Sequence, residues 1–144
     1  MQTEKVIDYI VNWLKDYATK AGVKGFVIGV SGGVDSGVVS TLCAMTGLKV
    51  LALEMPIRQQ KDQASRALEH IDFLKNKFPN VEGFTVDLNE PFEALYKTFD
   101  VKDDEFPAEK LAFANTRSRL RMLTLYYYGQ INGLLVCGTG NKVE

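Results

Sequence analysis

The fold is decided by residues 26–36, which read FVIGVSGGVDS. The first five of them form a short, wholly apolar run, which is typical of a strand buried on both faces of a parallel sheet. The glycine pair at residues 32–33 breaks the strand, and the pattern from Val34 onward predicts a helix. The loop therefore lies where a strand ends and a helix begins, which is where an open parallel sheet binds its ligands.

Strand-like and helical patterns alternate on both sides of this loop. Such alternation indicates a parallel sheet with right-handed crossovers. We therefore predict one α/β domain over residues 1–144, a Rossmann-like three-layer sandwich with a mostly parallel, four-stranded sheet and helices on both faces. The expected helices are 4–20, 34–45, 61–77, 92–99 and 107–128, and the expected strands are 26–30, 49–53, 83–86 and 133–137.

The composition excludes several other classes of protein. The chain has 144 residues, of which 46% are hydrophobic and 24% charged, as in an ordinary globular domain. A formal charge of -1 gives no basic excess for nonspecific nucleic-acid binding, and no apolar run is long enough to span a membrane. We expect a cytoplasmic protein with no nucleic-acid or membrane partner. Cys43 and Cys137 are expected to be reduced, buried thiols outside any nucleophile-like setting, and His70 a surface residue.

The glycine-rich loop has the composition of an anion site. Gly32 and Gly33 let backbone N–H groups approach an anion closely, and the following helix N-terminus adds oriented donors. Ser31 and Ser36 add hydroxyl groups. Asp35 would repel a bound phosphate unless a cation lay between them, and Mg²⁺ coordinates both carboxylate and phosphate oxygens. The loop predicts a phosphate or pyrophosphate site with Mg²⁺; the alternative is a tight turn in which Asp35 only favours the helix dipole.

A second segment, residues 53–63, follows the next strand at the same edge of the sheet and reads LEMPIRQQKDQ. Met55 offers an apolar surface and backbone groups suited to an adenine ring, and Gln60 offers hydrogen-bond donors and acceptors. The alternative is a plain loop followed by a helix cap.

A third segment lies on the long helix. At helical spacing, Asn115 is predicted to face inward with Arg119 at the edge of the same arc, whereas Arg117 lies on the opposite face as a solvated charge. Polar groups turned inward need a partner, either a bound anionic ligand or a buried structural carboxylate. The other residues on the arc are Leu111, Ser118, Met122 and Tyr126.

A fourth segment, residues 138–144, leaves the last strand at the same sheet edge. Thr139 can hydrogen-bond a ligand, and Glu144 is a candidate second Mg²⁺ ligand facing Asp35. The alternative is a frayed terminus without a role.

The loop SGGVDS resembles the signature of the pyrophosphate-releasing ATPases of the adenine-nucleotide α-hydrolase fold. It is followed, in order, by an MPxRxQ-like loop, an NxxxRxRM helix segment and a GTxxxxE segment, and this combination over residues 6–144 resembles the ammonia-dependent NAD synthetases. The chain departs from many relatives at Gly140 and Asn141, where they carry Asp-His, and from some at Glu54, where they carry arginine.

The resemblance implies a carbon–nitrogen ligase that amidates deamido-NAD with ammonia, using ATP and Mg²⁺, through an acyl-adenylate. No side chain acts as a nucleophile in that scheme. It implies ATP contacts at Gly29, Val30, Ser31, Gly32, Gly33, Val34, Asp35, Ser36, Met55, Gln60 and Thr139, deamido-NAD contacts at Asn115 and Arg119, and Mg²⁺ ligands at Asp35 and Glu144.

The resemblance also implies a homodimer with the long helices near its interface. Residues 126–128, three tyrosines, either contribute there or pack at the helix end. Because NAD synthetases are longer, the chain is expected to be an N-terminal portion, truncated at its C-terminus, with little turnover alone. Two rival functions remain open: a related ATPase that adenylates a purine or a tRNA base, and an ATP-binding module without catalysis.

Overall fold

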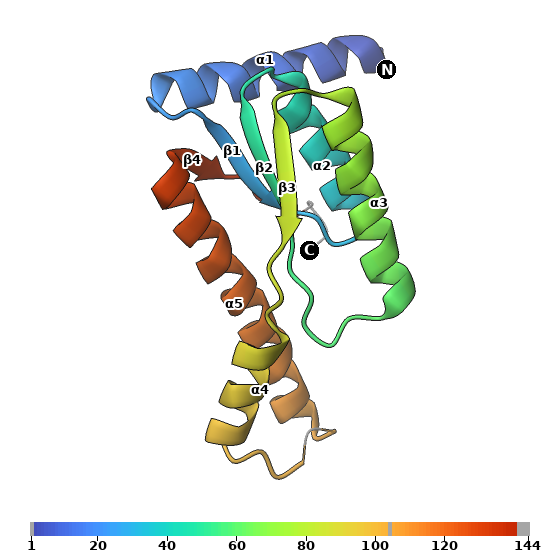
Figure 1. Ribbon diagram of the computed structural model, residues 1–144, viewed down its shortest axis with the longest axis vertical. Helices are drawn as coiled ribbons and strands as arrows, with labels where there is room; N and C mark the ends of the chain where they lie inside the picture. Colours follow the sequence, from blue (N-terminus) through green and yellow to red (C-terminus); the bar gives the residue numbers. More distant parts are fainter. Residues whose placement is uncertain (1, 104, 141–144) are drawn as a thin grey trace.

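The computed structural model describes residues 2–103 and 105–140. Helices and strands alternate along the chain as expected, and Figure 1 shows the strands running side by side toward one edge of the sheet. Of the helices in these two ranges, none has the length and apolar character needed to cross a membrane. The elements are α1 (Thr3–Lys20), β1 (Gly25–Gly29), α2 (Val34–Met45), β2 (Lys49–Glu54), α3 (Lys61–Lys77), β3 (Val81–Thr85), α4 (Asn89–Thr98), α5 (Pro107–Asn132) and β4 (Leu134–Val136).

The sheet has four strands in the order β3-β2-β1-β4, and every pairing is parallel. The apolar run that precedes the glycine-rich loop forms β1, which lies between β2 and β4, and four of its five residues are buried. Parallel neighbours on both sides bring the carboxyl ends of β1, β2 and β4 to one edge. The segments that follow these strands therefore meet in space.

Two apolar clusters cover the two faces of the sheet. One joins Ile28 of β1 to residues of α1, α2 and α3, and the other joins Val27 to residues of α4 and α5. Successive residues of a strand point to opposite faces, so adjacent residues of β1 belong to different clusters. The three-layer sandwich predicted from the sequence is confirmed, and α4 with the first turns of α5 extends beyond the carboxyl edge (Figure 1).

Helix α5 is longer than predicted and ends at Asn132 rather than near residue 128. Gly129, the residue after the predicted end, lies inside the helix and is buried. A Cβ there would stand 2.9 Å from the Leu134 carbonyl oxygen and 3.2 Å from Val27 Cγ1. The missing side chain lets α5 lie close to β1 and β4, and Gly133, in the left-handed conformation, ends the helix.

The prediction that His70 is a plain surface residue was wrong. Its ring is half-buried between α3 and α2, and Nε2 lies 2.9 Å from Ser40 Oγ. The Ser40 hydroxyl donates to the Ser36 carbonyl oxygen (2.6 Å), so its oxygen can accept from His70. His70 therefore links α3 to the helix that begins at the glycine-rich loop.

Protonation of His70 is expected to destabilise the fold. Burial lowers the pKa of His70, and a hydrogen bond with the Gly37 backbone opposes that effect only in part. Between the ordinary pKa and the lowered one, the unfolded chain binds a proton at His70 that the folded chain does not. The free energy of unfolding is therefore highest above about pH 6.5 and falls as the pH drops from there through the lowered pKa. Urea unfolding above and below this pH should show the loss. The variant His70→Gln should lack it, and an unchanged slope in that variant would contradict the assignment.

Candidate functional site

The glycine-rich loop is held in shape by its two serines. Ser36 Oγ accepts a hydrogen bond from the Ser31 backbone N–H (3.1 Å) and lies 3.2 Å from Ser31 Oγ, while Ser31 Oγ accepts from the Gly33 N–H (3.2 Å). Ser36 is only 3% exposed. Its hydroxyl therefore organises the loop from within, and the loop's outer surface is left to backbone groups and to Ser31.

Gly32 is required by the conformation of this loop. Its φ is +89°, in the left-handed region that favours glycine, and a Cβ would stand 2.4 Å from the Gln63 carbonyl oxygen of α3. The loop is thus pressed against the start of α3, the helix that follows the second segment singled out in the sequence.

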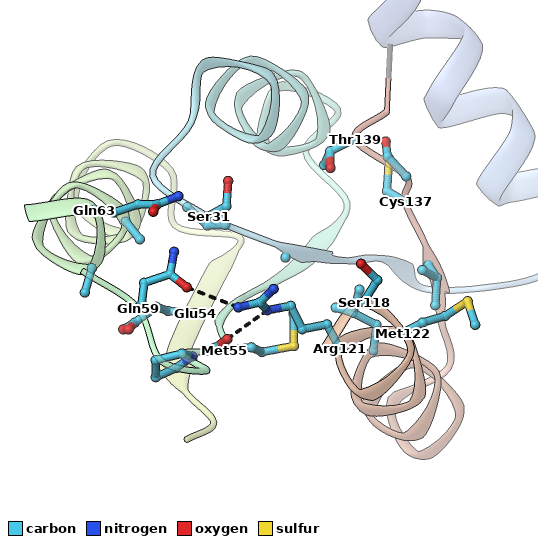
Figure 2. Close-up of a pocket in the computed structure, with 18 of the residues that line it drawn as sticks. Ser31, Glu54, Met55, Gln59, Gln63, Ser118, Arg121, Met122, Cys137 and Thr139 are labelled. Atoms are coloured by element: carbon cyan, nitrogen blue, oxygen red, sulfur yellow. Dashed lines mark hydrogen bonds between the residues drawn. The ribbon is translucent and has the colours of Figure 1, made fainter. Parts of the chain in front are cut away.

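A cavity of about 530 Å³ opens at the carboxyl edge of the sheet, between α3 and α5. It is the size expected of a pocket for a small molecule or cofactor. Figure 2 shows Ser31, Met55 and Thr139, which three different loops contribute to its lining. The lining residues that were singled out from the sequence as ATP contacts are Gly29, Val30, Ser31, Met55 and Thr139.

The other predicted site residues do not line this cavity. Asp35 lies in the first turn of α2, directly after the loop, and is partly buried. Gln60 is the exposed residue before α3. The remaining loop residues outside the lining are Gly32, Gly33, Val34 and Ser36, and Asn115 and Arg119 also lie outside it. Glu144 lies outside the described residues.

The predicted inward face of α5 was wrong. Asn115 and Arg119 are exposed, and so are their neighbours on the same arc: Leu111 is 63% exposed and Tyr126 59%. The opposite side is the buried one, and there Arg117 places its guanidinium carbon 5.8 Å from the centre of the Phe92 ring. Helix α5 carries apolar residues on both sides, so its periodicity did not reveal which side faces the sheet. Ser118, Met122 and Tyr126 border the cavity at its rim.

Arg121 lines the cavity, although the sequence pattern did not single it out. Its Nε donates to the Met55 carbonyl oxygen (3.0 Å) and one of its terminal nitrogens donates to Gln59 Oε1 (3.1 Å), as the dashed lines in Figure 2 show. Burial lowers its pKa, and the nearby charge of Arg117 adds to that effect. A signal was present in the sequence, since Arg117 and Arg121 are four residues apart and share the arc of Phe113 and Thr124.

Replacing Arg121 by methionine is expected to lower the free energy of unfolding by about 1–3 kcal/mol, because a charged donor is lost and a buried carbonyl keeps no partner. The matched control is Arg119→Met on the exposed side of the same helix, where a change within about 0.5 kcal/mol is expected. Urea unfolding of both variants provides the measurement. Equal losses in the two would show that Arg121 does not anchor the loop.

The loop after β2 has a second anchor in Arg58. Its guanidinium makes a two-pronged ion pair with Glu93 (2.7 and 3.0 Å) and lies over the rings of Phe92 and Tyr96 at 5.0 and 4.5 Å. The backbone N–H of Arg58 also donates a hydrogen bond to Asn89 Oδ1 (2.7 Å). The loop is therefore held by Arg121 at Met55 and Gln59 and by α4 at Arg58, which lies between them.

Glu54, the last residue of β2, lines the cavity. The residue is 6% exposed, and its Oε2 accepts a hydrogen bond from Thr85 Oγ1 (2.8 Å). A carboxylate at this end of the cavity disfavours phosphate and favours hydrogen-bond donors.

The residues present fit Mg²⁺ only as an ion that shares its coordination with a phosphate. Within the described residues, no three His, Cys, Asp or Glu side chains gather to hold a metal by themselves. Mg²⁺ is commonly held by one or two carboxylates together with substrate phosphates and water. Asp35, beside a helix N-terminus and a phosphate-type loop, supplies the kind of ligand that this arrangement needs.

Cys137 departs from the expectation of two buried thiols. It follows β4, is partly exposed and lines the cavity, while Cys43 of α2 is fully buried. Both cysteines are free, as expected, but their sulfur atoms lie 3.5 Å apart.

Proteins of known family resemble this chain in both sequence and structure. Residues 6–144 match the family model described as NAD synthase. The NH(3)-dependent NAD(+) synthetase of Mesoplasma florum is 38% identical over 145 residues, which cover 100% of the chain and 57% of that protein.

Solved structures of NMN and NAD synthetases resemble the chain in fold and in sequence. An NMN synthetase from Francisella tularensis matches 98% of the chain and 56% of its own length, with a TM-score of 0.83 and 34% identity. The NH3-dependent NAD synthetase from Campylobacter jejuni, solved in complex with the nitrate ion, matches 99% of the chain and 58% of its own, with a TM-score of 0.84 and 29% identity. The chain thus spans little more than half the length of these relatives.

Proposed function

The chain belongs to the NAD synthase family, and we therefore propose that it supplies the ATP site for the amidation of deamido-NAD by ammonia. The observation that supports this proposal is the cavity at the carboxyl edge of the sheet. The glycine-rich loop, the Met55 loop and the segment after β4 converge there, although they are far apart in the sequence. The products would be NAD, AMP and pyrophosphate, which makes the protein an amide-forming ligase.

The polarity of the cavity suggests how ATP lies in it. The adenine ring is placed at the Met55 end, where the thioether offers an apolar surface and the Glu54 carboxylate an acceptor for an amino group. The phosphates are placed at the other end, at the backbone N–H groups of the loop and the N-terminus of α2. The Ser36 hydroxyl forms hydrogen bonds with the Ser31 N–H and the Gly33 carbonyl oxygen inside the loop. The backbone of Ser36, rather than its side chain, would therefore face the pyrophosphate. Gln60 and Thr139 are proposed as further ATP contacts.

Catalysis in this scheme is positioning and charge neutralisation. The nicotinate carboxylate attacks the α-phosphate of ATP, pyrophosphate leaves, and ammonia then attacks the acyl-adenylate and releases AMP. Adenylation replaces a poor leaving group by a good one, so that one difficult step becomes two easier ones. Asp35, with Glu144 as the proposed second ligand, would hold the Mg²⁺ that neutralises the phosphate charge.

A homodimer is part of the proposal, with α5 at its interface. Asn115 and Arg119, proposed to bind deamido-NAD, are exposed and lie outside the cavity, so a second subunit packed on this side would enclose them. The same side of α5 exposes an unusual amount of apolar surface. Its members are Leu111 (63% exposed), Met122 (52%), Leu123 (67%), Tyr126 (59%) and Tyr127 (58%). Tyr128 instead packs edge-on against Phe84. A cytoplasmic location is proposed with this function.

The test is a product assay on the protein expressed from its whole reading frame. Deamido-NAD, ATP, Mg²⁺ and ammonia are expected to give NAD and AMP in equal amounts. Nicotinic acid mononucleotide is the second acceptor to assay, because one similar structure is that of an NMN synthetase. AMP released only with a purine or a tRNA would favour a related adenylating ATPase, and ATP binding without pyrophosphate release would favour a binding module.

A further inference from the structure

Two cysteines that are 94 residues apart in the sequence lie in contact beside the cavity at the carboxyl edge of the sheet. Cys43 belongs to α2, the helix that begins at the glycine-rich loop, and Cys137 follows β4. Their sulfur atoms are 3.5 Å apart, and residues 1–144 contain no other cysteine. A disulfide has an S–S distance near 2.05 Å, so bond formation requires an approach of roughly 1.5 Å.

The two thiols differ in exposure and in chemical character. Cys43 is fully buried, whereas Cys137 lines the cavity and is drawn near Thr139 in Figure 2. The Cys43 S–H donates to the Cys137 sulfur, which lowers the pKa of Cys137 against the opposing effect of burial. The same hydrogen bond, together with burial, raises the pKa of Cys43. Cys137 is therefore the nucleophilic, accessible thiol, and Cys43 is the protonated thiol behind it.

We propose that Cys43 and Cys137 form a redox-active dithiol, in which hydrogen peroxide that enters the cavity oxidises the pair to an intramolecular disulfide. The Cys137 thiolate attacks one peroxide oxygen, the O–O bond breaks, and Cys137 becomes a sulfenic acid while hydroxide leaves and takes up a proton as water. The Cys43 sulfur then attacks the Cys137 sulfur, its proton passes to the departing hydroxyl, and a second water leaves. Two thiols and one peroxide give one disulfide and two waters.

The disulfide would join α2 to the segment that leaves β4. That segment continues into Gly138 and Thr139, which line the cavity, while α2 begins at the loop that bounds it. Oxidation therefore acts on two walls of the same pocket. A ligand in the cavity would in turn cover Cys137, and this last point rests on the proposed function.

The test begins with the reduced 144-residue chain and equimolar hydrogen peroxide. Free thiols counted after denaturation are expected to fall from two per chain to none, with a loss of the two thiol hydrogens from the intact mass, and dithiothreitol should reverse both changes. The loss should not depend on protein concentration. Two free thiols remaining, or disulfide-linked dimers accounting for the loss, would overturn the proposal.

Two variants test the order of the steps. In Cys43→Ala, the sulfenic acid on Cys137 has no partner thiol and should be trapped by dimedone. In Cys137→Ser, the buried Cys43 should give no dimedone adduct when the folded chain is treated with peroxide. A dimedone adduct on Cys43 in the folded variant would overturn the assignment of Cys137 as the nucleophile. ATP is expected to slow the reaction of Cys137 with iodoacetamide. If the disulfide forms but ATP does not slow the reaction of Cys137 with iodoacetamide, the redox-active dithiol is supported and the proposal that ATP binds in this cavity is contradicted.

Discussion

Replacing Asp35 by asparagine is expected to lower Mg²⁺-dependent turnover by on the order of 10²-fold or more, the usual scale for loss of a group that stabilises transition-state charge. Asparagine keeps the size of the side chain but removes the charge that Mg²⁺ needs beside the phosphates. Asp35 lies in the first turn of α2, where a carboxylate contributes about 0.3–1 kcal/mol to helix stability through the helix dipole. The variant should therefore fold, and release of AMP in the coupled assay measures the loss.

The matched control is Asp72→Asn, an identical change at an exposed position of α3 away from the cavity. It should leave turnover unchanged, because an exposed charge far from the phosphates has little effect on them. If Asp35→Asn retained the activity of this control, Asp35 would not be a metal ligand. A non-catalytic ATP-binding module predicts instead that ATP binding is the same with aspartate or asparagine at residue 35.

Replacing Gly32 by alanine is expected to destabilise the fold by about 2–4 kcal/mol and to abolish nucleotide binding. The backbone there has φ +89°, and the added Cβ would meet the Gln63 carbonyl oxygen at 2.4 Å, which is far inside van der Waals contact. Because the obstacle is backbone rather than a flexible side chain, the loop itself must move. Urea unfolding and equilibrium dialysis with ATP provide the two measurements.

Gly22→Ala separates backbone strain from the clash. Gly22 has a similar φ of +72°, but nothing lies within 4 Å of the position that an added Cβ would take, so only strain of about 1–2 kcal/mol is expected. It lies in the connection between α1 and β1, away from the cavity, and ATP binding should be unaffected. Equal losses of ATP binding in the two variants would mean that the loop's close contact with α3 is not what shapes the site.

The sequence predicted the fold well because its strongest signals were local. Each predicted helix and strand has a counterpart, since apolar runs bounded by glycines and long periodic stretches reflect burial directly. The errors lie where tertiary packing overrides local preference. Helix α5 continues past its predicted end because Gly129 allows a close approach to β1. Strand β3 begins at Val81, two residues before its predicted start, and Val81 pairs with Val50.

Residues that line the cavity were predicted from the sequence only where they lie at or just after the end of a strand. The glycine loop, Met55 and Thr139 all follow parallel strands, so the topology alone brings them to one edge. Arg121 and Cys137 depend instead on which side of α5 faces the sheet and on how β4 lies against α2, and neither is set by spacing along the chain. A helix that is apolar on both sides gives no such information until its partners are known.

The most direct test of the proposed reaction follows oxygen from the substrate into the products. Deamido-NAD labelled with ¹⁸O in its nicotinate carboxylate is supplied with ATP, Mg²⁺ and ammonia to the protein expressed from its whole reading frame, and the phosphates are analysed by mass spectrometry. Attack of the carboxylate on the α-phosphate predicts that each AMP carries one labelled oxygen and that pyrophosphate carries none. Unlabelled AMP, or label in the pyrophosphate, would contradict activation of the carboxylate by adenylation.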